Sequence, residues 1–194
     1  MSRIRRMLVW LGRICHCRGF GVQSPWAYRM VRYVINEHYP YYAYSDLRAA
    51  FPGLGAVERK VCELCLRLAN SVRPSRVVAF GVAGEALGSY VKAGCRRADY
   101  VVVAGSGSLE CMRGAEMAVI APCDGFEHVF AAFSGGAVDG SVAVLLDIGR
   151  DGRARRLWRD TVAGRQGVVT FDLYYCGLVF FDRKRYKQNY VINF

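Results

Sequence analysis

The stretch "RVVAFGVAGEALGSY", from Arg76 to Tyr90, decides how the whole chain is interpreted. It opens with a short apolar run, meets glycines at Gly81 and Gly84, and continues with residues that favour helices. This order predicts a strand over Arg76–Phe80, a tight turn, and a helix over Glu85–Lys92. A glycine-rich turn between a strand and a helix is the usual setting of a nucleotide-type cofactor, because the backbone can approach a ligand closely there.

The chain beyond Tyr90 continues to alternate between strand and helix patterns. Such alternation indicates parallel βαβ units with right-handed crossovers. The strand-like runs are apolar almost throughout, as expected for parallel strands that are covered on both faces. The further strands are expected at 99–104, 116–121 and 141–147, and the longer helices at 125–133, capped by Asp124, and at 153–164.

The two ends of the chain depart from this alternation. Residues 1–72 show helix patterns and no strand pattern, with one helix beginning at Pro25 after a capping serine and another over 57–70. Near the C-terminus, "GVVTFDLYYCGLVFF" holds two strand-like runs that join at 175–177, which predicts an antiparallel hairpin. We therefore expect one compact α/β unit, with a helical N-terminal extension over 1–72 and a Rossmann-like domain over 73–194.

Positive charge gathers at both ends of the chain. The net charge is +11 over 194 residues, and no acidic residue precedes Glu37. Such ends permit an anionic partner, namely RNA, DNA, anionic lipid or an acidic substrate, or they form a solvated surface. The basic residues in question are Arg3, Arg5, Arg6, Arg13 and Arg18 at the start, and Arg183, Lys184, Arg185 and Lys187 near the end.

The first twenty residues, "MSRIRRMLVWLGRICHCRGF", can form a basic amphipathic helix. A helix of this kind lies on a membrane surface or, more often, packs on its own domain. The apolar run at 7–12 is too short for a signal peptide, and no segment is long enough without charge to span a bilayer. We expect a cytoplasmic protein without a transmembrane segment.

The eight cysteines leave two interpretations open. Cys15, His16 and Cys17 are too close in sequence for an ordinary chelating pair in a tetrahedral zinc site. Cys62 and Cys65 form a CxxC, but helical spacing puts Cys65 on the core face, and no second CxxC follows at a zinc-ribbon distance. Buried or free thiols are favoured over metal or redox work, and we assign no metal ligands.

Two flanking stretches resemble a known family. They are "RGFGVQSPWAYRMVRYVINEHYPYYAY" and "VTFDLYYCGLVFFDRKRYKQNYVINF". Both are similar to stretches of a group of Bacteroidetes proteins that resemble class I S-adenosylmethionine (SAM)-dependent methyltransferases. Phe20 and Gln23 stand where two histidines often stand in that group. The resemblance implies a Rossmann-like methyltransferase fold, a mostly parallel sheet that ends in an antiparallel hairpin, with SAM as the cofactor.

The cofactor region departs from the pattern of these methyltransferases. In that pattern the first strand ends in an acidic residue before a glycine-rich turn, and the second ends in an acid that binds the ribose hydroxyls. Here Ala79 and Ala104 stand at these two places. Gly81 fits the first glycine and Gly84 lies one position early for the second. The resemblance thus implies that Gly81, Ala83, Gly84 and Ala104 form the cofactor site, although a tight turn alone also explains the glycines.

The middle of the chain is also short for this fold. Between Ala104 and Ser141 there is room for one strand, so we infer that one βα unit is reduced or missing. Asp147, at the end of the strand over 141–147, is the candidate catalytic residue, as a general base or a metal ligand. An acid at that place is more often a cap for the next helix.

Three functional hypotheses follow. The first is a methyltransferase-like protein with an eroded SAM site, weakly active or non-catalytic; this one is favoured by the missing carboxylates. The second is an active SAM-dependent methyltransferase on an unknown acceptor. The third is a nucleic-acid-binding module that uses the basic termini. A homodimer through an exposed hairpin edge is a further expectation.

Overall fold

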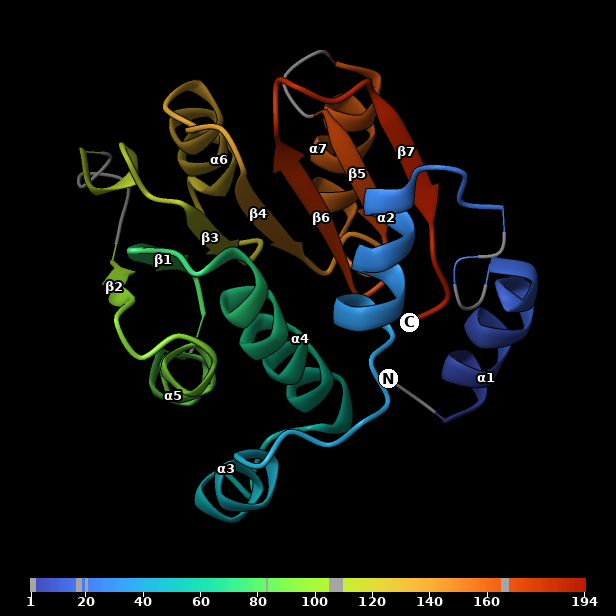
Figure 1. The fold of residues 1–194 in the computed structure, drawn as a ribbon, viewed down its shortest axis with the longest axis horizontal. Helices are drawn as coiled ribbons and strands as arrows, with labels where there is room; N and C mark the ends of the chain where they lie inside the picture. Colours follow the sequence, from blue (N-terminus) through green and yellow to red (C-terminus); the bar gives the residue numbers. More distant parts are fainter. Residues whose placement is uncertain (1–2, 17–18, 20, 83, 105–109, 165–167) are drawn as a thin grey trace.

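A seven-stranded sheet lies between two layers of helices (Figure 1). The computed structural model describes the chain apart from residues 1–2, 17–18, 20, 83, 105–109 and 165–167. The helices are α1 (Arg3–Gly12), α2 (Pro25–Met30), α3 (Tyr44–Ala50), α4 (Ala56–Val72), α5 (Gly84–Gly94), α6 (Phe126–Gly135) and α7 (Gly152–Ala163). The strands are β1 (Arg76–Phe80), β2 (Asp99–Val103), β3 (Met117–Ile120), β4 (Ser141–Leu146), β5 (Val169–Asp172), β6 (Cys176–Phe181) and β7 (Gln188–Val191).

The sheet is mostly parallel and contains the expected hairpin. Its strand order is β2-β1-β3-β4-β6-β5-β7. The first four pair in parallel, β6 runs antiparallel to both β4 and β5, and β7 is parallel to β5. The predicted architecture is therefore confirmed. β2 forms one edge of the sheet, and among the described residues no strand lies beyond it. This agrees with the expectation that one βα unit is reduced or missing in the middle of the sequence.

One detail of the hairpin prediction is wrong, namely the position of its turn. The turn was expected at 175–177 but lies two residues earlier, where the Leu173 N–H donates to the Cys176 carbonyl. Tyr174, in the middle of this turn, has a φ of +67°. The hairpin also has no free edge, because β4 pairs with β6 and β7 pairs with β5. The edge of the sheet on this side is therefore formed by β7, and a homodimer through this edge stays a prediction.

Apolar residues line both faces of the central strands. On one face α4 and α5 cover β1, where Val77 and Ala79 point. On the same face α2 lies over the hairpin, where Trp26 contacts Phe171 of β5 and Phe180 of β6. On the other face α6 packs on β3 and α7 on β4. Alternate residues of a strand point to opposite faces, so a strand covered on both sides needs a continuous apolar run. The edge strand β2 is less covered, and its Val102 is 47% exposed.

Helices α2 and α3 share the core on the α4 side of the sheet. Ser24 caps α2 as predicted, by accepting a hydrogen bond at its side chain. The buried Arg67 of α4 donates to the carbonyls of Val34 and Ile35 and to the hydroxyl of Tyr44 in α3. Helix α3 itself was not predicted, since its aromatic-rich sequence offers no side-chain cap.

Helix α1 leaves most of its apolar side exposed. The favoured expectation, that this helix packs its apolar side on its own domain, is therefore wrong. Ile4, Met7 and Leu8 are 73%, 63% and 62% exposed. The described segment that follows α1 is attached through Arg13, whose guanidinium lies 2.8 Å from the Asp172 carboxylate. Among the residues the structure describes, no helix is long and apolar enough to cross a membrane.

Candidate functional site

The strand order creates a crevice beside β1. From β1 the chain crosses to β2, the neighbour of β1 on one side, and then returns to β3, the neighbour of β1 on the other side. In open α/β sheets, ligands bind at such a reversal, beyond the carboxyl ends of the strands. A cavity of about 370 Å³ lies at this place, lined by Gly81 and Val82 after β1, by Leu146 and Asp147 at the end of β4, and by the first half of α4. Its size is within the range of small-ligand pockets.

The turn after β1 requires its first glycine for local reasons. Gly81 has a φ of +70°, a conformation that L side chains rarely adopt. A Cβ added there would lie 2.5 Å from the Cys123 Sγ and 3.2 Å from the Ala121 carbonyl oxygen. The backbone of Gly81 lines the cavity, but the direction of its missing side chain is filled by the loop after β3.

The second glycine serves the packing of α5. A Cβ at Gly84 would lie 2.6 Å from the Val102 Cγ2 of β2. Glycine at this position therefore lets the helix approach the edge strand. Gly84 does not line the cavity beside Gly81. Ala83, which the sequence analysis also assigned to the cofactor site, lies outside the described residues.

Alanines occupy the two strand ends where acids were expected. Ala79 is fully buried near the end of β1. Ala104 follows β2 directly, is exposed, and does not line the cavity. Neither methyl group can accept a hydrogen bond, so these strand ends offer no side-chain acceptor to a ligand.

Asp147 is the acidic residue that β4 brings to the cavity. It has a φ of +55°, and its N–H donates to the Tyr175 carbonyl at 2.7 Å. Its carboxylate accepts from the Arg150 guanidinium at 2.9 Å. It does not cap α7, because Asp151 accepts the hydrogen bonds from the N–H groups of the first helical turn. The structure thus brings Gly81 and Asp147 together in one cavity, and leaves Gly84 and Ala104 out of it.

Sequence reasoning missed two charged residues that line the same cavity, Glu58 and Arg150. The Glu58 side chain accepts from the Gly55 N–H at 2.9 Å and so stabilises the start of α4. Arg150 pairs with Asp147 across the turn after β4, where no helical spacing could have indicated the contact. The place of Glu58 had no local signal in the sequence either, since it depends on how α4 lies across the sheet.

Asp124 does not cap α6. Gly125 holds the N-cap position in a left-handed conformation. The Asp124 carboxylate instead lies 3.3 Å from the guanidinium of Arg153, which also binds Glu127 at 2.8 Å. His128 lies on the exposed side of α6, as predicted.

The CxxC cysteines are core thiols. Cys65 is fully buried, which confirms its predicted place on the core face of α4. Burial raises the pKa of Cys62 to about 11 and also raises the pKa of Cys65. Both thiols are therefore protonated at neutral pH, whereas redox and metal chemistry use the thiolate. Within the described ranges, no cluster of three or more histidine, cysteine or acidic residues is arranged to hold a metal ion.

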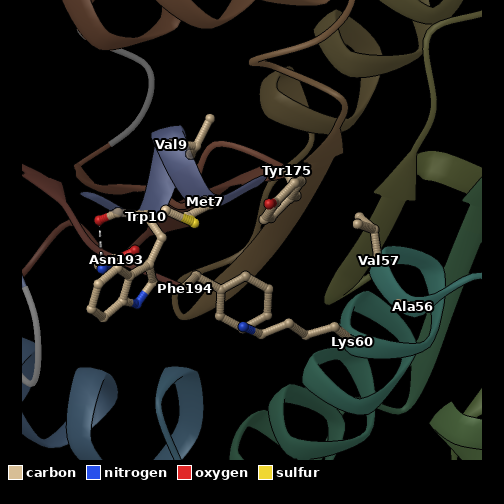
Figure 2. Close-up of a pocket in the computed structure, with 9 residues that line it drawn as sticks. All are labelled: Met7, Val9, Trp10, Ala56, Val57, Lys60, Tyr175, Asn193 and Phe194. Atoms are coloured by element: carbon tan, nitrogen blue, oxygen red, sulfur yellow. Dashed lines mark hydrogen bonds between the residues drawn. The ribbon is translucent and has the colours of Figure 1, made fainter. Parts of the chain in front are cut away.

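A second cavity, of about 380 Å³, adjoins the first. Val57 and Tyr175 line both cavities. Figure 2 shows Met7 and Trp10 of α1 on one side of it and Val57 of α4 on the other, with Phe194 and the end of the Lys60 side chain between them. The Lys60 ammonium lies 4.4 Å from the centre of the Phe194 ring, a cation–π distance. This space is bounded by α1, the start of α4 and the C-terminal segment.

Comparison with solved structures identifies the fold. No family model and no curated protein matches this chain. The O-methyltransferase TomG from Streptomyces achromogenes, in complex with SAM, is similar with a TM-score of 0.52, 12% identity, and coverage of 74% of this chain and 91% of that one. A methyltransferase from Podospora anserina bound to S-adenosylhomocysteine (SAH) gives a TM-score of 0.56, 8% identity, and coverage of 76% and 91%.

A third similar structure is the O-methyltransferase from Bacillus cereus in complex with SAH. Its TM-score is 0.51, its identity 13%, and the coverage is 76% of this chain and 93% of the other. At such low identity these likenesses concern the fold. The chain has the Rossmann-like fold of class I methyltransferases, as the sequence analysis expected.

Proposed function

We propose that this chain is a methyltransferase-like protein with an eroded cofactor site that binds SAM weakly or not at all, and that it is accordingly weakly active or non-catalytic. The observation that carries the proposal is the pair of alanines, Ala79 and Ala104, at the ends of β1 and β2. In the methyltransferase pattern the acid after the second strand accepts hydrogen bonds from the ribose. An exposed alanine methyl in its place leaves that part of the ligand without a partner from β2.

The expected loss of affinity is large. A hydrogen bond to a charged group contributes about 1.5–3 kcal/mol. Losing one such carboxylate corresponds to roughly a tenfold to hundredfold weaker complex, and losing two to considerably more.

The carboxylates that do line the cavity are poor substitutes. Glu58 already accepts from the Gly55 N–H, and Asp147 is paired with Arg150. A ligand would have to compete for both groups. The same ion pair limits Asp147 as a general base, because a base must be free to take a proton from the acceptor.

An active methyltransferase is the second candidate, and one observation favours it. Gly81 and Asp147 meet in one cavity at the strand-order reversal. Methyl transfer needs mainly alignment of the reactants and exclusion of water, so a site with few polar groups could still support it. The two candidates therefore differ in whether SAM binds at all.

Calorimetric titration with SAM and SAH separates the two candidates. We expect no saturable heat from the folded wild-type protein at millimolar ligand. Ala104→Asp should gain affinity by about tenfold or more, since it restores an acceptor beside the ribose position. Ala131→Asp is the matched control, because Ala131 is an exposed alanine on α6.

Micromolar binding by the wild-type protein would refute the proposal and support the active enzyme. Absence of any gain in Ala104→Asp, with the variant folded, would show that the missing acid is not what prevents binding.

We also propose a cytoplasmic location. Cys62, Cys65 and Cys176 are buried free thiols. Reduced cysteines are typical of proteins that stay in the reducing cytosol.

A further inference from the structure

Helix α1 carries an apolar stripe that the rest of the described structure leaves uncovered. Ile4, Met7, Leu8 and Leu11 follow the i, i+3, i+4, i+7 spacing of one helix face. Their exposed fractions are 73%, 63%, 62% and 45%. Large apolar side chains exposed side by side mark an interaction site more often than chance exposure does.

The opposite side of this segment is the side that faces the protein. Val9 and Arg13, four residues apart, are both less exposed than the stripe. Arg13 pairs with Asp172, and its guanidinium lies 5.5 Å from the centre of the Tyr174 ring. The Asn193 side chain donates to the Trp10 carbonyl at 3.3 Å. These contacts attach the C-terminal end of α1 to the hairpin and the C-terminal segment. Met7 lies at the second cavity, whereas Ile4, Leu8 and Leu11 are exposed and line no described cavity.

Charge distinguishes this helix from an ordinary apolar contact surface. The sequence of α1 includes Arg3, Arg5 and Arg6, its first turn has no acidic residue, and no acid occurs before Glu37. A partner must therefore offer both an apolar interior and negative charge. An amphipathic helix with this combination binds in the interface of a bilayer that contains anionic lipids.

We propose that α1 docks this protein on an anionic lipid bilayer. Ile4, Leu8 and Leu11 enter the boundary between headgroups and acyl chains, and the net positive charge of this part of the sequence attracts the anionic headgroups. Trp10, which is half exposed beside the stripe, suits the same interfacial depth.

Other occupants satisfy only part of these observations. A second copy of the chain would bring two basic helices together and would meet like-charge repulsion. A nucleic acid would neutralise the arginines but would leave the apolar stripe in water. In Figure 1, α1 lies at the outer side of the molecule, beside β7 and away from the helices that cover the centre of the sheet, so a flat surface can reach it.

Flotation with lipid vesicles tests the proposal. The full chain is mixed at low salt with vesicles of phosphatidylglycerol and phosphatidylcholine in equal parts, or of phosphatidylcholine alone. We expect the wild-type protein to float with the anionic vesicles and to stay behind with the neutral ones. The double variant Leu8→Glu/Leu11→Glu should reduce the bound fraction by about tenfold or more, since it removes apolar area and adds negative charge.

The control variant is Val138→Glu/Tyr186→Glu, which makes the same charge change at two exposed apolar residues outside α1. It should float like the wild type apart from a small loss from its reduced charge. Thermal unfolding of all three proteins checks that each is folded.

Three results would overturn the proposal. They are a wild-type protein that does not float, a Leu8→Glu/Leu11→Glu variant that floats as well as the wild type, and a control that loses binding as fully as the α1 variant. Light scattering gives a further check: a wild-type dimer that the α1 variant splits, without vesicle binding, would assign the stripe to self-association instead.

Discussion

Replacing Gly81 by alanine tests whether the turn after β1 is held by packing within the protein. The residue has a φ of +70°, and a Cβ would meet the Cys123 Sγ at 2.5 Å and the Ala121 carbonyl oxygen at 3.2 Å. Both the backbone conformation and the neighbouring loop therefore oppose a side chain here. If packing explains this glycine, the variant loses stability whether or not any ligand binds.

The magnitude has two parts. An alanine in the left-handed region costs roughly 1–2 kcal/mol. The overlap with Cys123 adds on the order of 1–3 kcal/mol, towards the low end because a thiol can rotate away. The lower entropy of the unfolded alanine variant returns about 0.4–1 kcal/mol. Gly81→Ala should thus destabilise the protein by about 1–2.5 kcal/mol.

Urea unfolding followed by tryptophan fluorescence measures this free energy in a double-mutant cycle. In the Cys123→Ala background the thiol is absent, so Gly81→Ala should cost only the backbone part less the same entropy, about 1 kcal/mol. A loss below about 0.5 kcal/mol for Gly81→Ala in the wild-type background would refute the packing argument. It would instead suggest that the glycine serves the approach of a ligand to the cavity. Equal losses in both backgrounds would remove Cys123 from the explanation.

Three further predictions concern packing, thiol reactivity and pH. Gly94→Ala should destabilise the protein by about 3 kcal/mol in thermal unfolding, because its Cβ would lie 2.1 Å from a backbone carbonyl oxygen of α4, whereas Gly135→Ala, with open space around it, should be neutral or stabilising. Iodoacetamide at neutral pH should label the exposed Cys15 well before Cys62, whose pKa burial raises to about 11, and equal labelling rates by mass spectrometry would contradict that burial. Burial acts to raise the pKa of Glu116, but hydrogen bonds from Ser75, just before β1, outweigh it and lower the pKa. Glu116→Gln should therefore be less stable than wild type at neutral pH, and this difference in stability should vanish as the pH falls through the lowered pKa. Urea unfolding midpoints across this pH range measure the difference.

The sequence predicted the sheet well because its strands are covered on both faces. β1, β3 and β4 need continuous apolar runs, and such runs between helical patterns are readable without a structure. The C-terminal stretch "NYVINF" indicated a strand that extends the hairpin edge, and the pairing of β7 with β5 confirms it. The bounds of β7 were harder to read, because its residues alternate between half-buried and exposed over only one short run.

The candidate site was readable only where a strand ends. Gly81 and Asp147 follow directly from β1 and β4, so topology alone brings them to one edge of the sheet. Glu58 reaches the same cavity from α4, and no local pattern states how a helix lies across a sheet. The exposed stripe of α1 was misjudged for a related reason: an amphipathic pattern shows that a helix has an apolar side but not what covers it.

The contrast between the glycines and the missing carboxylates has a physical basis in this fold. Gly81 and Gly84 are required by close contacts to Cys123 and Val102, so any chain with this turn and this helix packing needs them, with or without a cofactor. Ala104 is exposed, and exchange of an acid for alanine at such a position changes stability little. A glycine pattern after the first strand is therefore weak support for SAM binding, whereas the residue after β2 reports on it directly. This is why the titration of Ala104→Asp decides more about function than any substitution of the glycines.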